Sequence, residues 1–474
     1  MMRLDRRAAL GALAALPLGG ALAAERSDIT GILARHMVAS RAAVLPPAVM
    51  EAARHRILDT LGAMISGARM RPGLAALRYV QGLGGKGEAG VAASSFRTSA
   101  VNAALANAMC AHADETDDFE PVTKAHPGCS AVPAALAIGE KNGASGMDLI
   151  RAVVLGYDLG CRLLMALGPD SVRAGHRSAE GTSSTYCALG SAILAPLDET
   201  GMRYALSYGA QQVSGLWSWV DDEDHIEKAF DFAGMGARNG VMAVTMVEAG
   251  LTGVHDVLDG THNLLRALSA RPDPAAMVAG LGQDFFITRS AIKTYTVGYP
   301  NQSALDALLT LRREHGLSAE RIAAVLVHLP SDAVGIVGQS AMPDVNCPHL
   351  VSVALLRGGV SFVDAHDAAL MKDPTVLAIR ARVKVVGDES LMDPAAPRGA
   401  IVEITLKDGT VLRHHTRFPS GTPENPLSAQ AVEAKVMDLI VPVLGRSASQ
   451  RLVDTVWALE RLDNVRKLAA LMRA

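Results

Sequence analysis

The feature that most constrains the fold of this chain is a change of apolar pattern near Arg271. Before that point, apolar and small residues recur three and four positions apart, as they do from Leu149 through Val153 and Gly156 to Leu163. This spacing is the period of an amphipathic helix. After it come short β-branched segments, which are typical of strands. The pattern therefore predicts a helical part followed by a part that contains a sheet.

Three segments after the change carry the strand signal: Arg321–Leu329, Ala381–Val386 and Ile401–Leu406. Lys407-Asp408-Gly409 and then Thr410–Phe418 follow the last of them, and Asp-Gly between two such runs predicts a β-hairpin. Gln302–Arg313 is expected to form a helix, and the pattern is helical again from Ser428 to the end. We therefore predict a mainly α fold, with a large all-helical domain plus a smaller α+β lid domain.

Composition fits this organisation and excludes several classes of protein. The 474 residues are 49% hydrophobic, which supports more than one core. A net charge of −3 with no basic block, and only 4% aromatic residues, argue against a nucleic-acid binder. The five cysteines show no CxxC spacing, so no zinc or iron–sulfur framework is expected. The predicted boundaries are 1–24 for a signal segment, 25–271 and 425–474 for the helical domain, and 272–424 for the lid.

The first residues resemble a twin-arginine export signal. Arg6-Arg7 precede the uncharged stretch Ala8–Ala24, and Ala21-Leu22-Ala23 is a small-x-small cleavage site. The stretch is short for a membrane span and is broken by Pro17 and three glycines, although an N-terminal anchor is the alternative interpretation. We expect a periplasmic protein with no stable membrane span after cleavage.

The densest group of ionisable residues runs from His112 to Asp118 and is followed by Lys124 and His126. Neighbouring carboxylates raise one another's pKa, and this can make one of them a general base near neutral pH. His126 can share the proton transfer or bind a substrate carboxylate. Two alternatives stay open: a solvated acidic loop, and a metal site from His112, Asp117 and His126, whose spacing is not diagnostic.

Other candidates are single residues in less specific surroundings. Gly175–Ser178, which contains His176, precedes small hydroxyl residues that can begin a helix and bind an anion. Lys228 follows an acidic run, and Lys293 stands before Tyr295. For each lysine the alternative is an exposed surface cation. No phosphate-binding loop, zinc-protease helix or nucleophile elbow is present in the sequence.

The order of these segments resembles the MmgE/PrpD family, which includes 2-methylcitrate dehydratase, cis-aconitate decarboxylase and an iminodisuccinate epimerase. The resemblance runs from about Ile29 to the C-terminus. The segments that carry it are Ile57–Gly62, Asn102–Asp118, His126–Gly128, Lys228–Gly240, Gly250–Gly260 and Lys293–Ala307. The resemblance implies a homodimer with its active site between the two domains, no metal or organic cofactor, no nucleic-acid partner, and a small carboxylate substrate.

The resemblance also implies roles for individual residues. The implied catalytic residues are His126, Glu115, Asp117 and Lys293, and the implied substrate-binding residues are Lys228, His176, Asp118, Tyr295 and His349. Several positions depart from the family pattern. Glu115 stands for Asp, Ser183 and Gln302 stand where histidines are usual, and His349 falls on or near a tyrosine. These departures affect the choice of substrate.

The expected function is a cofactor-independent lyase or isomerase that removes the proton α to a carboxylate of a small di- or tricarboxylate. Loss of water would make it a dehydratase, which is the commonest family activity. Loss of carbon dioxide would make it a decarboxylase, and reprotonation on the other face an epimerase. The alternative is an exported protein that binds a small polycarboxylate and has lost turnover, which the missing histidines and the signal segment suggest.

Overall fold

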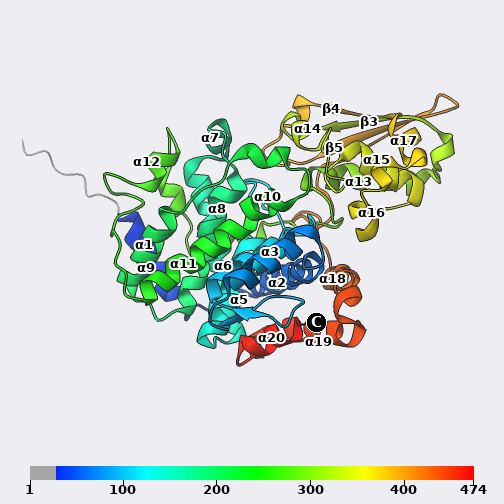
Figure 1. Ribbon diagram of the computed structural model, residues 1–474. Coiled ribbons are helices and arrows are strands. Elements are labelled where there is room, and N and C mark those ends of the chain that lie inside the picture. Colours follow the sequence, from blue (N-terminus) through cyan, green and yellow to red (C-terminus); the bar gives the residue numbers. More distant parts are fainter. Residues whose placement is uncertain (1–27, 474) are drawn as a thin grey trace, which may run out of the picture.

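A computed structural model describes residues 28–473, and Figure 1 shows a large helical body beside a smaller α+β part. The predicted signal segment, residues 1–24, lies outside the described residues. We call residues 28–292 and 428–473 the helical body, and residues 295–418 the α+β part. Up to Leu268 the helices of the body are α1 (Ile29–Ser40), α2 (Pro47–Gly67), α3 (Arg71–Leu83), α4 (Ala100–Ala111), α5 (Gly128–Asn142), α6 (Gly146–Leu167), α7 (Pro169–Ala174), α8 (Ala179–Ala188), α9 (Glu199–Ala210), α10 (Ile226–Ala229), α11 (Met235–Glu248) and α12 (Leu264–Leu268).

The chain returns to the helical body after the α+β part. Figure 1 shows these last helices, in red, beside the body, and they are α18 (Ala429–Leu444), α19 (Arg446–Trp457) and α20 (Val465–Leu471). Val436 and Leu439 of α18 pack onto α2 at Gly62. One continuous apolar core contains side chains from both stretches of the body. Burial of this shared core joins segments that lie far apart in the sequence.

Two glycines on the predicted face of α6 permit a close contact with α8. A Cβ atom at Gly156 or Gly160 would collide with Cys187 of α8, at its backbone carbonyl and its thiol respectively. The glycines cost helix propensity, but they let the two helices approach along their length. The pair of glycines therefore places α8 directly against α6.

The α+β part has a sheet, helices and a separate apolar core. Its strands are β3 (Ile322–Leu329), β4 (Val383–Gly387), β5 (Ala400–Leu406) and β6 (Val411–Thr416), and its helices are α13 (Gln302–His315), α14 (Ser331–Val337), α15 (Cys347–Arg357), α16 (Phe362–His366) and α17 (Pro374–Arg380). The strand order is β4-β3-β5-β6, with β3 and β4 parallel and the other pairs antiparallel. The β5–β6 hairpin turns at Asp408-Gly409, where Gly409 has φ of 88°. This φ lies in the left-handed region that suits glycine.

The predicted fold class, mainly α with a smaller α+β part, is confirmed. The three predicted strands and the hairpin are present, and α13 and α18 begin at the predicted residues or one residue later. One short antiparallel pairing, β1 (Ala89–Gly90) with β2 (Arg97–Thr98), was not predicted, because two residues a strand give no alternating pattern. The exact domain boundaries stay a prediction. Between residues 28 and 473, no helix is both long and apolar enough to cross a bilayer.

Candidate active site

The ionisable segment after α4 is a buried loop in the structure. From His112 to Asp118 every residue is at most 2% exposed, and the loop ends where Pro127 precedes α5. Buried charges are stable only when they are paired or hydrogen-bonded. The interpretation of this segment as a solvated acidic loop is therefore wrong, and its charges must have partners.

Glu115 binds two lysines from distant parts of the chain. Lys228 of α10 donates to Oε1, and Lys293 donates to Oε2 at 2.9 Å. Lys293 Nζ also lies 3.4 Å from Asp117 Oδ1. Lys228 belongs to the helical body, while Lys293 stands in the segment that leads into the α+β part. This loop therefore gathers residues from both sides of the junction, and the alternative interpretation of both lysines as surface cations is wrong.

Asp117 lies between two histidines. His126 Nδ1 donates to Asp117 Oδ2 at 2.9 Å. His112 Nδ1 approaches Asp117 Oδ1 to 2.9 Å, although the ring does not point along the line of a hydrogen bond. The bond from His126 assigns the proton of its neutral ring to Nδ1 and leaves Nε2 as an acceptor. His126 is thus oriented as a base, with Asp117 as the group that orients it.

The pKa shifts of these groups show that the two carboxylates are ionised. Burial pushes the pKa of Glu115 upward, but Lys228 and Lys293 outweigh it and hold that pKa well below its ordinary value. Burial acts in the same way on Asp117, and His112 and His126 hold its pKa well below the ordinary value. Carboxylates that keep their charge so strongly are weak bases. Of the expected bases, the histidine is therefore better suited to take a proton.

Asp118 lies behind this group. Its Oδ1 accepts the Gly128 N–H at the start of α5, and the hydroxyl of Tyr157 and the guanidinium of Arg56 are its electrostatic neighbours. Burial raises the pKa of Asp118 to about 6. Asp118 does not line the cavity described next. Its position supports the loop and does not fit the substrate-binding role that the resemblance implied.

A cavity opens beside the loop. Among the predicted residues, His126, Glu115 and Lys228 line it, while Asp117 and Lys293 contact these from behind. The lining comes from both the helical body and the α+β part. The residues that line the cavity are Glu115, Phe119, Lys124, His126, Pro169, Asp170, Arg173, Arg177, Ala179, Glu180, Trp217, Trp219, Lys228, Phe232, Gly298, Tyr299, Pro300, Ile336, Val345 and Arg398.

Aromatic rings surround the Lys228 ammonium. Its Nζ lies 5.2 Å from the centroids of both Trp219 and Phe232, and the Phe232 ring stacks on His112 at 4.3 Å. Phe232 stands in a π-helical turn, Phe230–Gly234, between α10 and α11. Such turns are rare in proteins, and those that occur are often at functional sites. The rings stabilise the cation by cation–π attraction and exclude water around it.

Backbone strain is concentrated at the same place. Five described non-glycine residues have positive φ, and three of them are Glu115 (54°), Lys124 (66°) and His225 (64°). The left-handed region costs of order 1 kcal/mol or more for such residues. Tertiary contacts must therefore hold these side chains in place.

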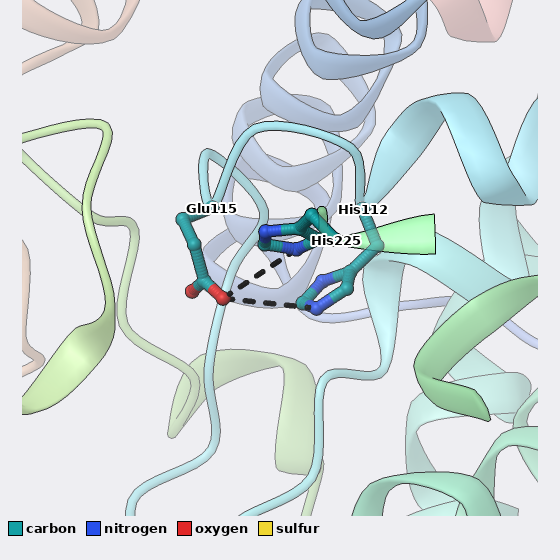
Figure 2. A group of neighbouring side chains, drawn as sticks. All are labelled: His112, Glu115 and His225. Carbon is teal, nitrogen blue, oxygen red and sulfur yellow. Dashed lines mark ion pairs between the residues drawn. The ribbon is translucent and has the colours of Figure 1, made fainter. Parts of the chain in front are cut away.

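Figure 2 shows how His112 and His225 face the Glu115 carboxylate. Their Nε2 atoms lie 3.9 and 3.7 Å from Glu115 Oε1. This trio, and separately His112, Asp117 and His126, could each offer three metal ligands. However, the same carboxylates bind Lys228 and Lys293, whose ammonium groups would repel a metal cation. The charges suit an anion better than a metal.

Three predicted substrate-binding residues lie outside the cavity. His176 is exposed, and its carbonyl accepts the Trp217 N–H. Tyr295 donates its hydroxyl to Asp306 within the α+β part. His349 is buried in α15, its ring has no hydrogen-bond partner among the described residues, and burial lowers its pKa to about 4. The structure does not bring these three side chains to the group around Glu115.

Several lining residues were not among the predicted site residues. Arg177 directly follows His176 in the segment Gly175–Ser178, and it was missed because histidine was preferred to arginine as the candidate there. Trp217 and Trp219 are two of the three tryptophans in the chain, and their spacing was an available signal. His225, three residues before Lys228, was also missed. Arg398 carries no local signal, because only the tertiary fold brings it to the cavity.

Comparison with known protein families agrees with this arrangement. The model of the MmgE/PrpD N-terminal domain matches residues 31–277, and the model of the MmgE/PrpD C-terminal domain matches residues 295–461. Together the two matches span most of the chain. The chain therefore belongs to the MmgE/PrpD family, whose members are generally dehydratase-like enzymes, as 2-methylcitrate dehydratase is.

Proposed function

We propose that this member of the MmgE/PrpD family is a lyase that removes the proton α to a carboxylate of a small di- or tricarboxylate and then eliminates water. The observation that carries the proposal is a single cavity that both an oriented imidazole, His126, and a buried ammonium, Lys228, line. A base and a cation side by side are what abstraction next to a carboxylate requires, because negative charge develops on that carboxylate as the proton leaves.

His126 is the proposed base. Its Nε2 takes the proton from the α-carbon, and the electron pair of the broken C–H bond moves into the carboxylate. Asp117 holds the ring through Nδ1 and stabilises the imidazolium that forms. The same ring can take a proton and then give it back.

Lys228 is the proposed ligand of the carboxylate that gains the charge. An ammonium has three donors, and the structure assigns one of them to Glu115, which leaves others for a ligand. Lys228 is 3% exposed, so its attraction for a substrate carboxylate is screened far less than in water. Glu115 supplies the opposite charge that this buried ammonium needs.

Lys293 is a positioning residue in this account, since it contacts Glu115 and Asp117 but does not line the cavity. Burial lowers its pKa, but Glu115 and Asp117 outweigh this and raise that pKa above its ordinary value. Lys293 therefore stays charged and fixes both carboxylates. Its role differs from the catalytic one that the resemblance implied.

Elimination completes the reaction. The electron pair returns from the carboxylate and forms a double bond between the α- and β-carbons as hydroxide leaves, and a proton from the His126 imidazolium converts the hydroxide to water. If the proton instead returned to the other face of the α-carbon, the product would be an epimer. Elimination is the proposed outcome, because it is the general activity of the family.

The experiment is a panel of 2- and 3-hydroxy di- and tricarboxylates, each incubated with the enzyme and followed by proton NMR. The expected result is loss of one acid and growth of a vinyl signal from its dehydrated product. A Lys228→Met variant should abolish this conversion, and Lys86→Met, a change in an exposed loop, should leave it unchanged. Tight calorimetric binding of an acid without conversion of any panel member would contradict the proposal and favour a binding protein.

A further inference from the structure

A second group of cations lines the same cavity, away from the Glu115 loop, and we call it the rim group: Lys124, Arg173, Arg177 and Arg398. Three of its members bind one carboxylate, that of Asp332 in the first turn of α14. Lys124 Nζ lies 2.6 Å from Asp332 Oδ2, and Arg173 Nη1 lies 3.2 Å from the same atom. Arg398 Nη1 lies 3.0 Å from Oδ1.

The rim group has more positive charge than its own contacts neutralise. Asp332 is the only carboxylate within ion-pair distance of Lys124, Arg173 or Arg398 among residues 28–473, and Arg177 has none there. Burial raises the pKa of Asp332, but Arg398 and Lys124 outweigh it and lower that pKa to about 2. One carboxylate among four cations leaves a strong local preference for a further anion. Asp170 and Glu180 also line the cavity, but neither forms an ion pair with these cations.

Two buried donors that line the cavity have no acceptor in the described part of the chain. Arg398 is 6% exposed, and its Nε has no hydrogen-bond partner. Trp219, 3% exposed and next to Lys228, likewise has no acceptor for its Nε1. A buried donor without an acceptor destabilises the fold by about 1–3 kcal/mol. Both residues also line the cavity.

We infer that the rim group is a second anion subsite, which binds a substrate carboxylate remote from the carbon that loses its proton. The inference rests on the proposed function for the identity of the ligand. Arginine suits this role, since its planar guanidinium bonds a carboxylate through two parallel N–H groups. The cavity would then hold a polycarboxylate by both ends: one carboxylate at Lys228, and another at the rim group.

Asp332 competes with the ligand in this arrangement. Its carboxylate occupies three of the four rim cations, so it lowers the affinity of the rim for any other carboxylate. Removing its charge should therefore strengthen ligand binding, whereas removing an arginine should weaken it. Opposite changes in ligand affinity on loss of Asp332 and on loss of an arginine distinguish a binding site from a merely structural ion-pair cluster. In a structural cluster, loss of either partner would weaken the cluster.

The experiment is isothermal titration calorimetry with tricarballylate, a tricarboxylate that has no hydroxyl group to eliminate, and with butyrate as a monocarboxylate. Arg177→Met should weaken tricarballylate binding about tenfold or more, as expected for a charge-assisted hydrogen bond. Asp332→Asn should tighten it at least about threefold at low salt. Both variants should bind butyrate as the wild type does. The control is Arg69→Met, an exposed arginine outside the cavity, which should change neither ligand.

Arg177 is the more informative variant, because it forms no ion pair with Asp332, and its loss should not disturb the contact between the two parts of the chain. Tricarballylate binding within twofold of wild type in Arg177→Met, or weaker binding in Asp332→Asn, would overturn the inference. The proposed function fails separately. If no hydroxy acid is converted while these affinities change as expected, the anion subsite stands and the lyase proposal does not.

Discussion

Lys293→Met removes one charge from the buried group around Glu115, and its effect can be worked out from the contacts. Lys293 is fully buried and contacts Glu115 Oε2 at 2.9 Å and Asp117 Oδ1 at 3.4 Å. Its loss leaves two buried carboxylates with Lys228 as the one remaining ammonium. Removal of one partner from a buried ion pair destabilises a protein by about 3–5 kcal/mol, because the other charge is left uncompensated. We expect a loss of this size in the free energy of unfolding at pH 7.

The pH dependence gives this prediction its sign. Glu115 and Asp117 have lowered pKa values in the fold, so their ion pairs stabilise it above the unfolded values, about 4.3 and 3.9, and this stabilisation disappears as pH falls through the folded values. In Lys293→Met, one of the cations that lower the pKa of Glu115 and Asp117 is absent, so burial raises both pKa values relative to the wild type. The difference in stability between wild type and variant should therefore be largest near neutral pH and should narrow as pH falls through the folded pKa values of these carboxylates, first in the variant and then in the wild type.

The assay is urea unfolding followed by far-UV circular dichroism, at several pH values. The double variant Lys293→Met/Asp117→Asn restores the balance of charge, because Glu115 and Lys228 then remain as one pair, and it should recover about half of the loss or more. Lys86→Met controls for the loss of a lysine from an exposed loop. A loss under about 1 kcal/mol at pH 7, a gap that widens in acid, or a double variant less stable than Lys293→Met would refute the reasoning.

The remaining predictions concern other groups. Burial raises the pKa of Asp118 to about 6, so the free energy of unfolding should fall by about 3 kcal/mol as pH rises from about 4 to above 6 and the carboxyl ionises. Asp118→Asn should remove this fall, which is followed as melting temperature against pH. Dialysis against EDTA should leave turnover unchanged, because the carboxylates that could bind a metal already bind Lys228 and Lys293; a loss restored by added Zn²⁺ would contradict this. Light scattering should give twice the mass of one chain, and a monomer at micromolar concentration would exclude the expected homodimer.

Local sequence pattern made these parts of the fold predictable. The Asp-Gly turn and the return to helix after Ser428 are encoded locally, in turn residues and spacing, and the structure has both of them. The two-stranded pairing at Ala89–Gly90 escaped notice because it depends on contacts and not on periodicity. Spacing and turn residues were sufficient to predict most helices and strands, whereas the pairing of β1 with β2 depends on tertiary contacts.

The site was predictable only in part. Glu115, Asp117 and His126 are near one another in the sequence, so their grouping was visible, and the resemblance to a family added Lys228 and Lys293. The rim cation Arg398 stands just before β5, far in the sequence from the other lining residues, and no spacing indicates it. His349 was a reasonable candidate by position, yet it is buried inside α15. Whether each of these side chains reaches the cavity depends on the tertiary fold, which local spacing in the sequence does not give.

The most direct test of the central claim is the exchange of the α-proton of the acid that the panel identifies. In deuterated water the wild type should incorporate deuterium at that carbon, and His126→Gln should slow incorporation by about 10²-fold or more, since a positioned base contributes 10²–10⁴-fold. Asp117→Asn should slow it less, because an amide oxygen can still accept the Nδ1–H of His126. Incorporation by His126→Gln at the wild-type rate would contradict the account, because some other group would then be the base.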